Sequence, residues 1–302
     1  MGVLFNRYLT VSFLKPSVVI GGRQEIRGNV VVLPPTIEFS FRFDEESNPN
    51  DGEIIIHNMS PETQRMVLEE GAPVSVEAGY WPVGGQRETG IIFEGQITKA
   101  YTNFKNAGAA TRILVGDSED AYAHARVRQV FDGKSHAEIA QAITDSFKAR
   151  GVQIGRIDVP DFTEPRPRTV DRLARQELQD LAYQHDLQWS IKNGVLNVYP
   201  RDDVNRPGRM ILTPGTGVVG IPEFNDKGAT IKTYMLPTIN SGDVIQYQNN
   251  KIISRITEDF KVQGIEFHGN NARGFFGTTI DARYLSEGKV IRSRERYIGG
   301  KT

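Results

Sequence analysis

A strict alternation of apolar and polar residues is the feature that most constrains how this chain of 302 residues can fold. The stretch TIEFSFRF (36–43) places an apolar side chain at every second position, and YLTVSFL (8–14) and PVSVEAGY (73–80) repeat the pattern. Successive side chains of a β-strand point to opposite faces, so each stretch predicts a strand with one buried and one solvated face. GIIFEGQITKAY (90–101) and ATRILVGD (110–117) continue the series. We therefore predict an antiparallel barrel or sandwich for the first third of the chain.

Capping signals predict two helices that interrupt the β pattern. The stretch SPETQRMVLEEG (60–71) begins with a serine suited to the N-cap, has proline at the first helical position and ends on a glycine. In GKSHAEIAQAITDSFKARG (133–151), Ser135 and Glu138 have the spacing of a capping box, and Gly151 is suited to end the helix.

A change of pattern after Asp117 predicts a small α+β unit. The stretch TVDRLARQELQDLAYQHD (169–186) predicts a further helix. The buried face expected for it consists of Val170, Leu173, Leu178, Leu181 and Ala182. The stretch LQWSIKNGVLNVYP (187–200) predicts a hairpin, because Asn193-Gly194 favours a type I′ turn between two alternating strands.

The β pattern resumes at Met210 and weakly repeats the first third. APVSVEAGY (72–80) matches SGDVIQYQN (241–249), and FEGQITKAYTNF (93–104) matches FKVQGIEFHGNN (260–271). One interpretation is an internal duplication, and the other is chance, because short β patterns often match one another.

These patterns divide the chain into four parts. We predict a mainly β protein with an α+β insert: a first β-barrel domain (1–118), the insert (119–204), a second β-barrel domain (205–282) and a basic tail (283–302). The last twenty residues carry six Lys or Arg against two Glu. The tail is either disordered or a contact for the acidic patch of a partner.

Two glycine-containing stretches imitate nucleotide-binding motifs. GTGVVGIP (215–222) has the spacing G-x-G-x-x-G, but a dinucleotide turn needs a helix directly after it, and Pro222 and a polar turn follow instead. We predict a glycine loop between strands. DGKS (132–135) resembles the end of a phosphate-binding loop, but Arg128 stands where that motif needs glycine. Ser135 is better explained as a helix cap.

The inventory of catalytic residues is nearly empty. The chain has no cysteine, so disulfides, thiol catalysis and cysteine-ligated zinc are excluded. Its five histidines show no i, i+4 pair, and no G-x-S-x-G is present. We therefore predict no catalytic, cofactor-binding or metal-binding residues, no cofactor and no enzymatic activity.

Charge and hydropathy narrow the classes of partner. The net charge is −1 and the pI is about 6.6, so no global basic field attracts nucleic acid. No run of 18 apolar residues is present, and the start, MGVLFNRYLTVSFLK, lacks the features of a secretion signal. We expect that the chain has no membrane anchor and that it assembles in a host cytoplasm.

Three stretches in this order together resemble the family of phage tail baseplate hub proteins. The first runs from IEFSFRF (37–43) through EIIIHNMSPETQRMVLEEGAPVSVEAGYW (53–81) to GIIFEGQITKAY (90–101). The second is TRILVGDSEDAY (111–122), followed by the capped helix near residue 135. The third runs from LQWSIKNGVLNVYP (187–200) into LTPGTGVVGIPEFNDKGATIKTYMLPTINSGDVIQYQ (212–248). The basic C-terminus has no counterpart in the family pattern.

The resemblance implies a hub similar to that of T-even phages and to the N-terminal part of type VI secretion VgrG spike proteins. Such hubs are homotrimers in which each chain has two barrels like those of tail tube proteins. Three chains thus form a ring of six barrels between the sixfold tail tube and the threefold central spike. Other implied partners are further baseplate or tape-measure proteins, with DNA passing through the lumen without sequence-specific binding. The implied location is the virion, in the tail baseplate.

In such a ring, two hairpin loops are candidates for contacts between subunits. NFKNAGAA (103–110) and HGNNARGFFG (268–277) are either docking loops between subunits or ordinary exposed loops.

Two alternative functions stay open at this point. One is a tail enzyme that cleaves the cell wall, which would need a carboxylate pair in a cleft with one raised pKa. The other is a glycan-binding tail module, in which Tyr80, Trp81 and Trp189 would stack on sugars.

Overall fold

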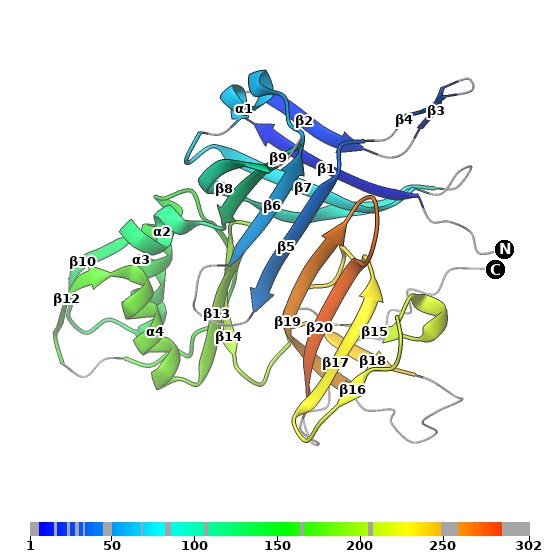
Figure 1. The fold of residues 1–302 in the computed structure, drawn as a ribbon. Coiled ribbons are helices and arrows are strands. Elements are labelled where there is room, and N and C mark those ends of the chain that lie inside the picture. The colour runs from blue at the N-terminus through cyan, green and yellow to red at the C-terminus, as the bar shows by residue number, and fades with distance from the viewer. Residues whose placement is uncertain are drawn as a thin grey trace.

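The computed structural model of the protein describes residues 6–14, 17–22, 25–27, 30–32, 34–44, 50–67, 69–81, 86–105, 108–163, 166–204, 208–248 and 259–285. Strands dominate these residues, and the largest sheet has 13 strands that are almost all antiparallel. The predicted fold class, mainly β with an α+β insert, is confirmed (Figure 1). None of the helices described is long and apolar enough to cross a membrane.

The first β region is an antiparallel sheet in the order β5-β6-β9-β8-β7-β1-β2. Its strands are β1 (Arg7–Leu14), β2 (Ser17–Gly22), β5 (Ile37–Asp44), β6 (Asp51–His57), β7 (Pro73–Tyr80), β8 (Glu88–Lys105) and β9 (Gly108–Gly116). Strands β3 (Glu25–Arg27) and β4 (Val30–Val32) form a separate antiparallel pair. Helix α1 (Pro61–Val67) begins where predicted, with Ser60 Oγ accepting a hydrogen bond from the Thr63 N–H at 3.1 Å.

The second β region has the order β16-β17-β20-β19-β18-β15. Its elements are β15 (Arg209–Leu212), a 3₁₀ turn η1 (Pro214–Thr216), β16 (Glu223–Phe224), β17 (Gly228–Tyr234), β18 (Val244–Tyr247), β19 (Asp259–Asn270) and β20 (Phe276–Tyr284). Strands β15 and β18 are parallel, and the other pairs are antiparallel. Strand β20 includes two residues of the predicted basic tail, and 286–302 lie outside the described residues.

Strand β19 joins the two β regions into one sheet. Its first residues, Asp259–Lys261, pair with β18, and from Gly264 onward the same strand pairs with β5. A shift in register between Val262 and Gly264 accompanies this change of partner, as a β-bulge would produce. One hydrophobic core therefore underlies both regions, and aromatic rings such as Phe43 and Phe267 meet in it with centroids 6.0 Å apart.

The α+β unit has a hydrophobic core of its own (Figure 1, green). Its elements are α2 (Glu119–His124), β10 (Arg126–Phe131), α3 (His136–Lys148), β11 (Gln153–Ile157), β12 (Arg168–Leu173), α4 (Ala174–Gln184), β13 (Leu187–Lys192) and β14 (Val195–Pro200). The predicted capping box of α3 is present, with Ser135 and Glu138 each bonding the backbone of the other. The predicted hairpin is also confirmed, and Asn193 and Gly194 both have positive φ, at 48° and 72°, as a type I′ turn requires.

The helix predicted over 169–186 is wrong in its first third. Residues 168–173 form β12, which pairs antiparallel with β10, and helix α4 begins only at Ala174. Val170 and Leu173 match a helical stripe by spacing, but they also fit a strand, and pairing with β10 decides between the two. Of the predicted buried face, Val170, Leu178, Leu181 and Ala182 lie in the core of the unit, whereas Leu173 is half-buried.

The topology supports the internal duplication. In both regions a strand, β7 or β18, precedes a long hairpin, β8–β9 or β19–β20. The second arm of each hairpin pairs with β6 or β17, and Ile113 opposite Ile54 corresponds to Ile280 opposite Ile231. One difference is that β1 joins β7 antiparallel, whereas β15 joins β18 in parallel.

Candidate assembly surfaces

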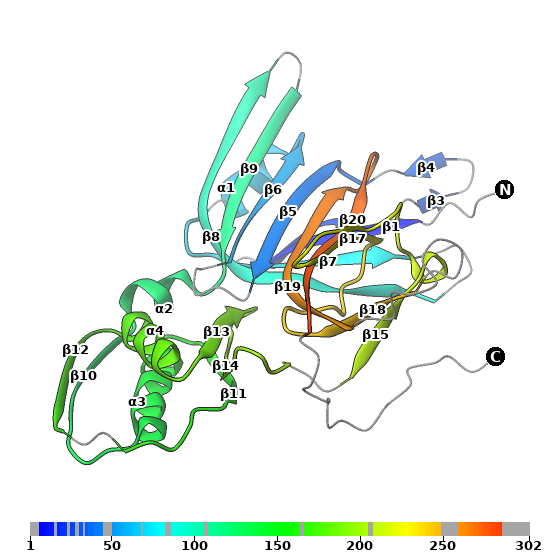
Figure 2. The same ribbon diagram turned by 90° about the horizontal axis from the view of Figure 1, so that it is seen from below.

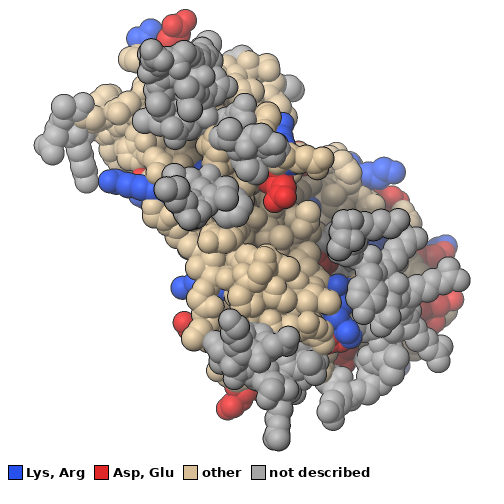
Figure 3. Space-filling model, turned by 90° about the vertical axis from the view of Figure 1, so that its right-hand side faces the viewer, with Lys and Arg blue, Asp and Glu red and all other residues tan. Residues whose placement is uncertain are grey.

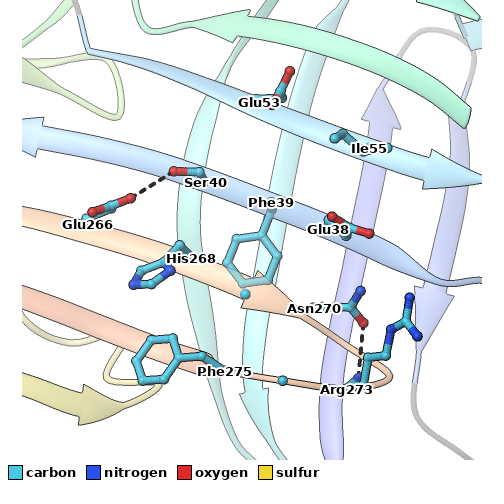
Figure 4. Close-up of a pocket in the computed structure, with 12 residues that line it drawn as sticks. Glu38, Phe39, Ser40, Glu53, Ile55, Glu266, His268, Asn270, Arg273 and Phe275 are labelled. Atoms are coloured by element: carbon cyan, nitrogen blue, oxygen red, sulfur yellow. Dashed lines mark hydrogen bonds between the residues drawn. The ribbon is translucent and has the colours of Figure 1, made fainter. Parts of the chain in front are cut away.

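A shallow hollow of about 580 Å³ lies over strands β5, β6 and β19, on the face of the sheet opposite the core (Figure 4). The alternation of the strands determines its chemistry, because residues between the buried aromatic positions point outward. Its polar lining includes Glu38, Glu53, Glu266, His268 and Arg273.

Each acidic side chain in this hollow has a partner. Glu38 Oε1 lies 3.0 Å from His57 Nε2, and Glu53 Oε1 lies 2.8 Å from Arg112 Nε. Ser40 Oγ donates to Glu266 Oε1 at 3.1 Å (Figure 4). The three carboxylates of the floor are thus each held by a neighbouring polar side chain, one of them by an arginine.

The histidine in the hollow is held towards its neutral form. Burial lowers the pKa of His268, with Lys232 lowering it further and Glu266 opposing the shift. The ring lies against Phe275, with centroids 4.6 Å apart, and Nε2 is 3.1 Å from Thr279 Oγ1. These contacts fix the imidazole against the sheet.

Among the described residues, the carboxyl group with a raised pKa is that of Asp117, which lies outside this hollow. Burial raises the pKa of Asp117 to about 6, and its Oδ1 accepts hydrogen bonds from Gly194 N at 2.9 Å and Ser118 Oγ at 2.8 Å. Asp117 is only 1% exposed and lies where β9 meets the α+β unit. The arrangement suits a structural joint, because a glycosidase acid needs access to the bond that it protonates.

The β13–β14 hairpin of the α+β unit contacts both β regions at its turn. Asn193 Oδ1 accepts from the Glu94 N–H at 3.1 Å, which ties the turn to β8. Lys192 Nζ donates to Asn240 Oδ1 at 2.7 Å and lies 4.8 Å from the centre of the Phe43 ring. This hairpin therefore fixes the unit against the shared sheet.

The tip of the β19–β20 hairpin is bound to the first β region. Arg7 donates to the carbonyl oxygens of Asn270 and Gly274 at 2.6 and 2.5 Å. Asn271 accepts from the Ile37 N–H at 2.9 Å and donates to Pro35 O at 2.8 Å. The loop 268–277 is therefore held within its own chain, and docking between subunits stays a prediction for it.

The corresponding tip of the β8–β9 hairpin projects away from the body of the protein (Figure 2). Phe104, near its end, is 80% exposed. Thr102 Oγ1 contacts Gln64 of α1 at 3.3 Å and Thr111 of β9 at 3.1 Å. Beyond Thr98, β8 has only β9 as a strand partner within the described part of the chain. The loop 103–110 falls on this projecting arm.

The two glycine-containing motifs have structural roles. Residues 215–220 form a loop between β15 and β16 in which Thr213 and Thr216 bond each other's backbone, and Gly217 adopts φ 102° against the Tyr234 ring. A two-residue strand follows it, where a dinucleotide turn would need a helix. Ser135 of the DGKS stretch caps α3.

The aromatic residues of the glycan-binding alternative are mostly buried. Trp189 is 3% exposed, and its Nε1 donates to Gln179 at 3.1 Å. Tyr80 is 9% exposed, and its hydroxyl donates to Phe276 O at 2.8 Å. Only Trp81 is half-buried, and its ring lies beside Tyr8 and Arg87. These three side chains form no joint platform for a sugar.

On the face of the protein that Figure 3 shows, the charged side chains that are drawn do not gather into one patch. Figure 3 shows Lys, Arg, Asp and Glu scattered around a largely uncharged middle. Among the described residues, no group of three His, Cys, Asp or Glu gathers in a way that could hold a metal ion.

Comparison with solved structures identifies the class of fold. The tail protein of Neisseria meningitidis MC58 superposes with a TM-score of 0.60 at 11% identity, covering 94% of this chain and 98% of that one. The 43 kDa tail protein of prophage MuSo2 from Shewanella oneidensis gives 0.59 at 10% identity, covering 91% and 97%. The Escherichia coli c3393 protein gives 0.57 at 13% identity, covering 84% and 75%. That protein is described as a type VI secretion component structurally similar to the T4 tail proteins gp27 and gp5.

The chain therefore has the fold shared by phage tail proteins and type VI secretion proteins of this kind. The predicted resemblance is confirmed for the fold, while the low identities leave function to be argued separately. No family model and no curated protein sequence matches the chain.

Proposed function

We propose that the protein is the structural hub of a phage tail baseplate, a homotrimer that connects a sixfold tail tube to a threefold central spike. Three copies would place six β regions in one ring. The observation that carries the proposal is the pair of topologically equivalent β regions joined edge to edge in one chain. A duplicated chain is what a threefold assembly needs in order to present a sixfold face.

The proposed domain division follows the same logic. Residues 1–118 and 205–282 would be the two barrels like those of tail tube proteins, and 119–204 the insert on the outside of the ring. The separate hydrophobic core of the insert supports this division. The basic tail, 283–302, would lie beyond the second barrel.

A ring of this kind would enclose a channel for DNA. The polar outer face of β5, β6 and β19 is a suitable channel wall, because its carboxylates Glu38, Glu53 and Glu266 leave it without an excess of positive charge. Such a wall would release few counterions on contact with a polyanion, so DNA would slide without being held. The protein would act in the virion, without enzymatic activity, alongside tube, spike and other baseplate or tape-measure proteins, after assembly in the host cytoplasm.

Electron microscopy of the purified chain tests the proposal. We expect particles with threefold symmetry and a central hole, whose six similar lobes alternate around the ring. Particles of monomer size at high protein concentration, together with virions that lack such a ring, would rule the proposal out.

A further inference from the structure

One edge of strand β8 is open over its last third. The strand pairs with β7 along residues 88–96 and with β9 to its end, so beyond Thr98 one edge faces no strand among the described residues. An open edge presents unpaired N–H and C=O groups to which another strand can add. This open edge leads to the exposed Phe104.

The equivalent edge in the second β region is occupied. Strands β8 and β19 each shift register against their hairpin partner, between Ile97 and Lys99 and between Val262 and Gly264. Aligning the two shifts makes Lys99 equivalent to Gly264. The open stretch 99–105 then corresponds to 264–270, which is the stretch that pairs with β5.

The second β region also contains a counterpart of β5. In the first region, Ile37 and Phe41 lie opposite Ile56 and Gly52 of β6. In the second, Val218 and Phe224 lie opposite Thr233 and Ala229, the equivalent positions of β17. The segment 217–224 therefore occupies the place of β5, with two additional residues between its paired ends.

The outer edge of that segment is open as well. No strand lies beyond β16 in the described part of the sheet, and Ile221 is 67% exposed. These two edges are thus free among the described residues, and their equivalents, β19 and β5, bind each other within the same molecule.

We infer that β8 of one copy pairs antiparallel with β16 of a second copy, as β19 pairs with β5 inside the chain. This inference rests on the proposed function, since a ring of copies is what brings the two edges together. The internal register, in which Phe267 faces Phe41 and His268 faces Ser40, fixes the intermolecular one. Thr102 faces Phe224, and Asn103 faces Glu223.

Disulfide trapping tests this register without background, because the chain has no cysteine. One preparation carries Asn103→Cys and another Glu223→Cys, both at exposed positions. Facing Cα atoms in antiparallel strands lie about 4.5–5.5 Å apart, within the range that a disulfide spans. We expect a covalent dimer when the two are mixed and oxidised, in at least tenfold excess over either preparation alone.

Two controls accompany the experiment. Lys232→Cys is exposed but lies on the inner strand β17, so its mixture with Asn103→Cys should stay uncross-linked. Ser40→Cys with His268→Cys in one chain reproduces the internal pair and should close within the molecule.

The outcomes separate this inference from the hub proposal. If the internal pair closes and the mixed preparations stay uncross-linked, the edge contact is overturned. A trimer by sedimentation in that case would leave the hub proposal standing with a different interface. A chain that neither cross-links nor assembles would overturn both.

Discussion

The two long hairpins show how one element serves two purposes in a duplicated chain. The β19–β20 hairpin pairs with β5, and its tip is held by Arg7 and by the contact of its own Asn271 with Ile37. Phe267 is buried where β19 meets β5. The β8–β9 hairpin has the same topology, but its equivalent edge is open and Thr102 takes the place of Phe267. We interpret the docked hairpin as one that stabilises the chain, and the projecting hairpin as one that serves the proposed assembly.

The largest expected effect comes from the join itself. Phe267→Ala should lower the free energy of unfolding by about 3–5 kcal/mol, because it leaves a cavity among buried aromatic rings. Thr102→Ala at the equivalent position of β8 should cost about 1 kcal/mol, mainly for its hydrogen bonds. Chemical denaturation of both variants measures the contrast. Equal losses would show that the two hairpins contribute alike to the fold of the chain.

The next effect concerns the joint between the sheet and the α+β unit. Burial raises the pKa of Asp117 from 3.8 to about 6. As the pH falls, the folded chain therefore binds a proton at Asp117 at a higher pH than the unfolded chain does. The contribution of Asp117 to stability should therefore fall by about 2–3 kcal/mol as pH rises from 3.8 to beyond 6. Asp117→Asn keeps an acceptor for Gly194 N and should remove this pH dependence.

Unfolding curves recorded from pH 4 to pH 7 measure this dependence. Asp132→Asn, at an exposed position, is the matched control and should follow the parent chain. A difference between Asp117→Asn and the parent that stays constant over the pH range would contradict the assigned ionisation.

A smaller effect is expected at the docked tip. Arg7→Ala removes two hydrogen bonds to backbone carbonyls and should cost about 1–3 kcal/mol of stability. Arg273→Ala, on the same tip but with an exposed side chain, should change stability by less than about 0.5 kcal/mol. Hydrogen exchange at residues 270–276 would locate the loss, and unchanged protection in Arg7→Ala would show that the tip is held by other contacts.

The smallest effect on folding is expected at the projecting tip. Phe104→Ala should change the free energy of unfolding by less than about 0.5 kcal/mol, because the side chain is 80% exposed. The same variant should weaken self-association measured by sedimentation. A large loss of folding stability with unchanged association would reverse the roles that we give to the two hairpins.

Local patterns in the sequence predicted the features that depend on neighbours along the chain. The alternation around Phe39 and Phe41, the Ser135–Glu138 capping box and the Asn193-Gly194 turn all act within a few residues, and each is confirmed. Strand β12 was missed because pairing with β10, some forty residues earlier, overrides a helical spacing.

The surfaces depend on contacts that no local pattern records. Loops 103–110 and 268–277 look alike in sequence, yet one projects and the other is held by Arg7, which lies 263 residues before Asn270. The sequence match of 93–104 with 260–271 places Thr102 against Gly269. Only the register shared by the two hairpins shows that Thr102 is equivalent to Phe267.

The mass of the purified chain in solution tests the central claim most directly. Sedimentation equilibrium over a wide range of concentrations should reveal a species of three times the 33.7 kDa of one chain. A single species of one-chain mass at every concentration, from a protein that is folded by circular dichroism, would contradict the account.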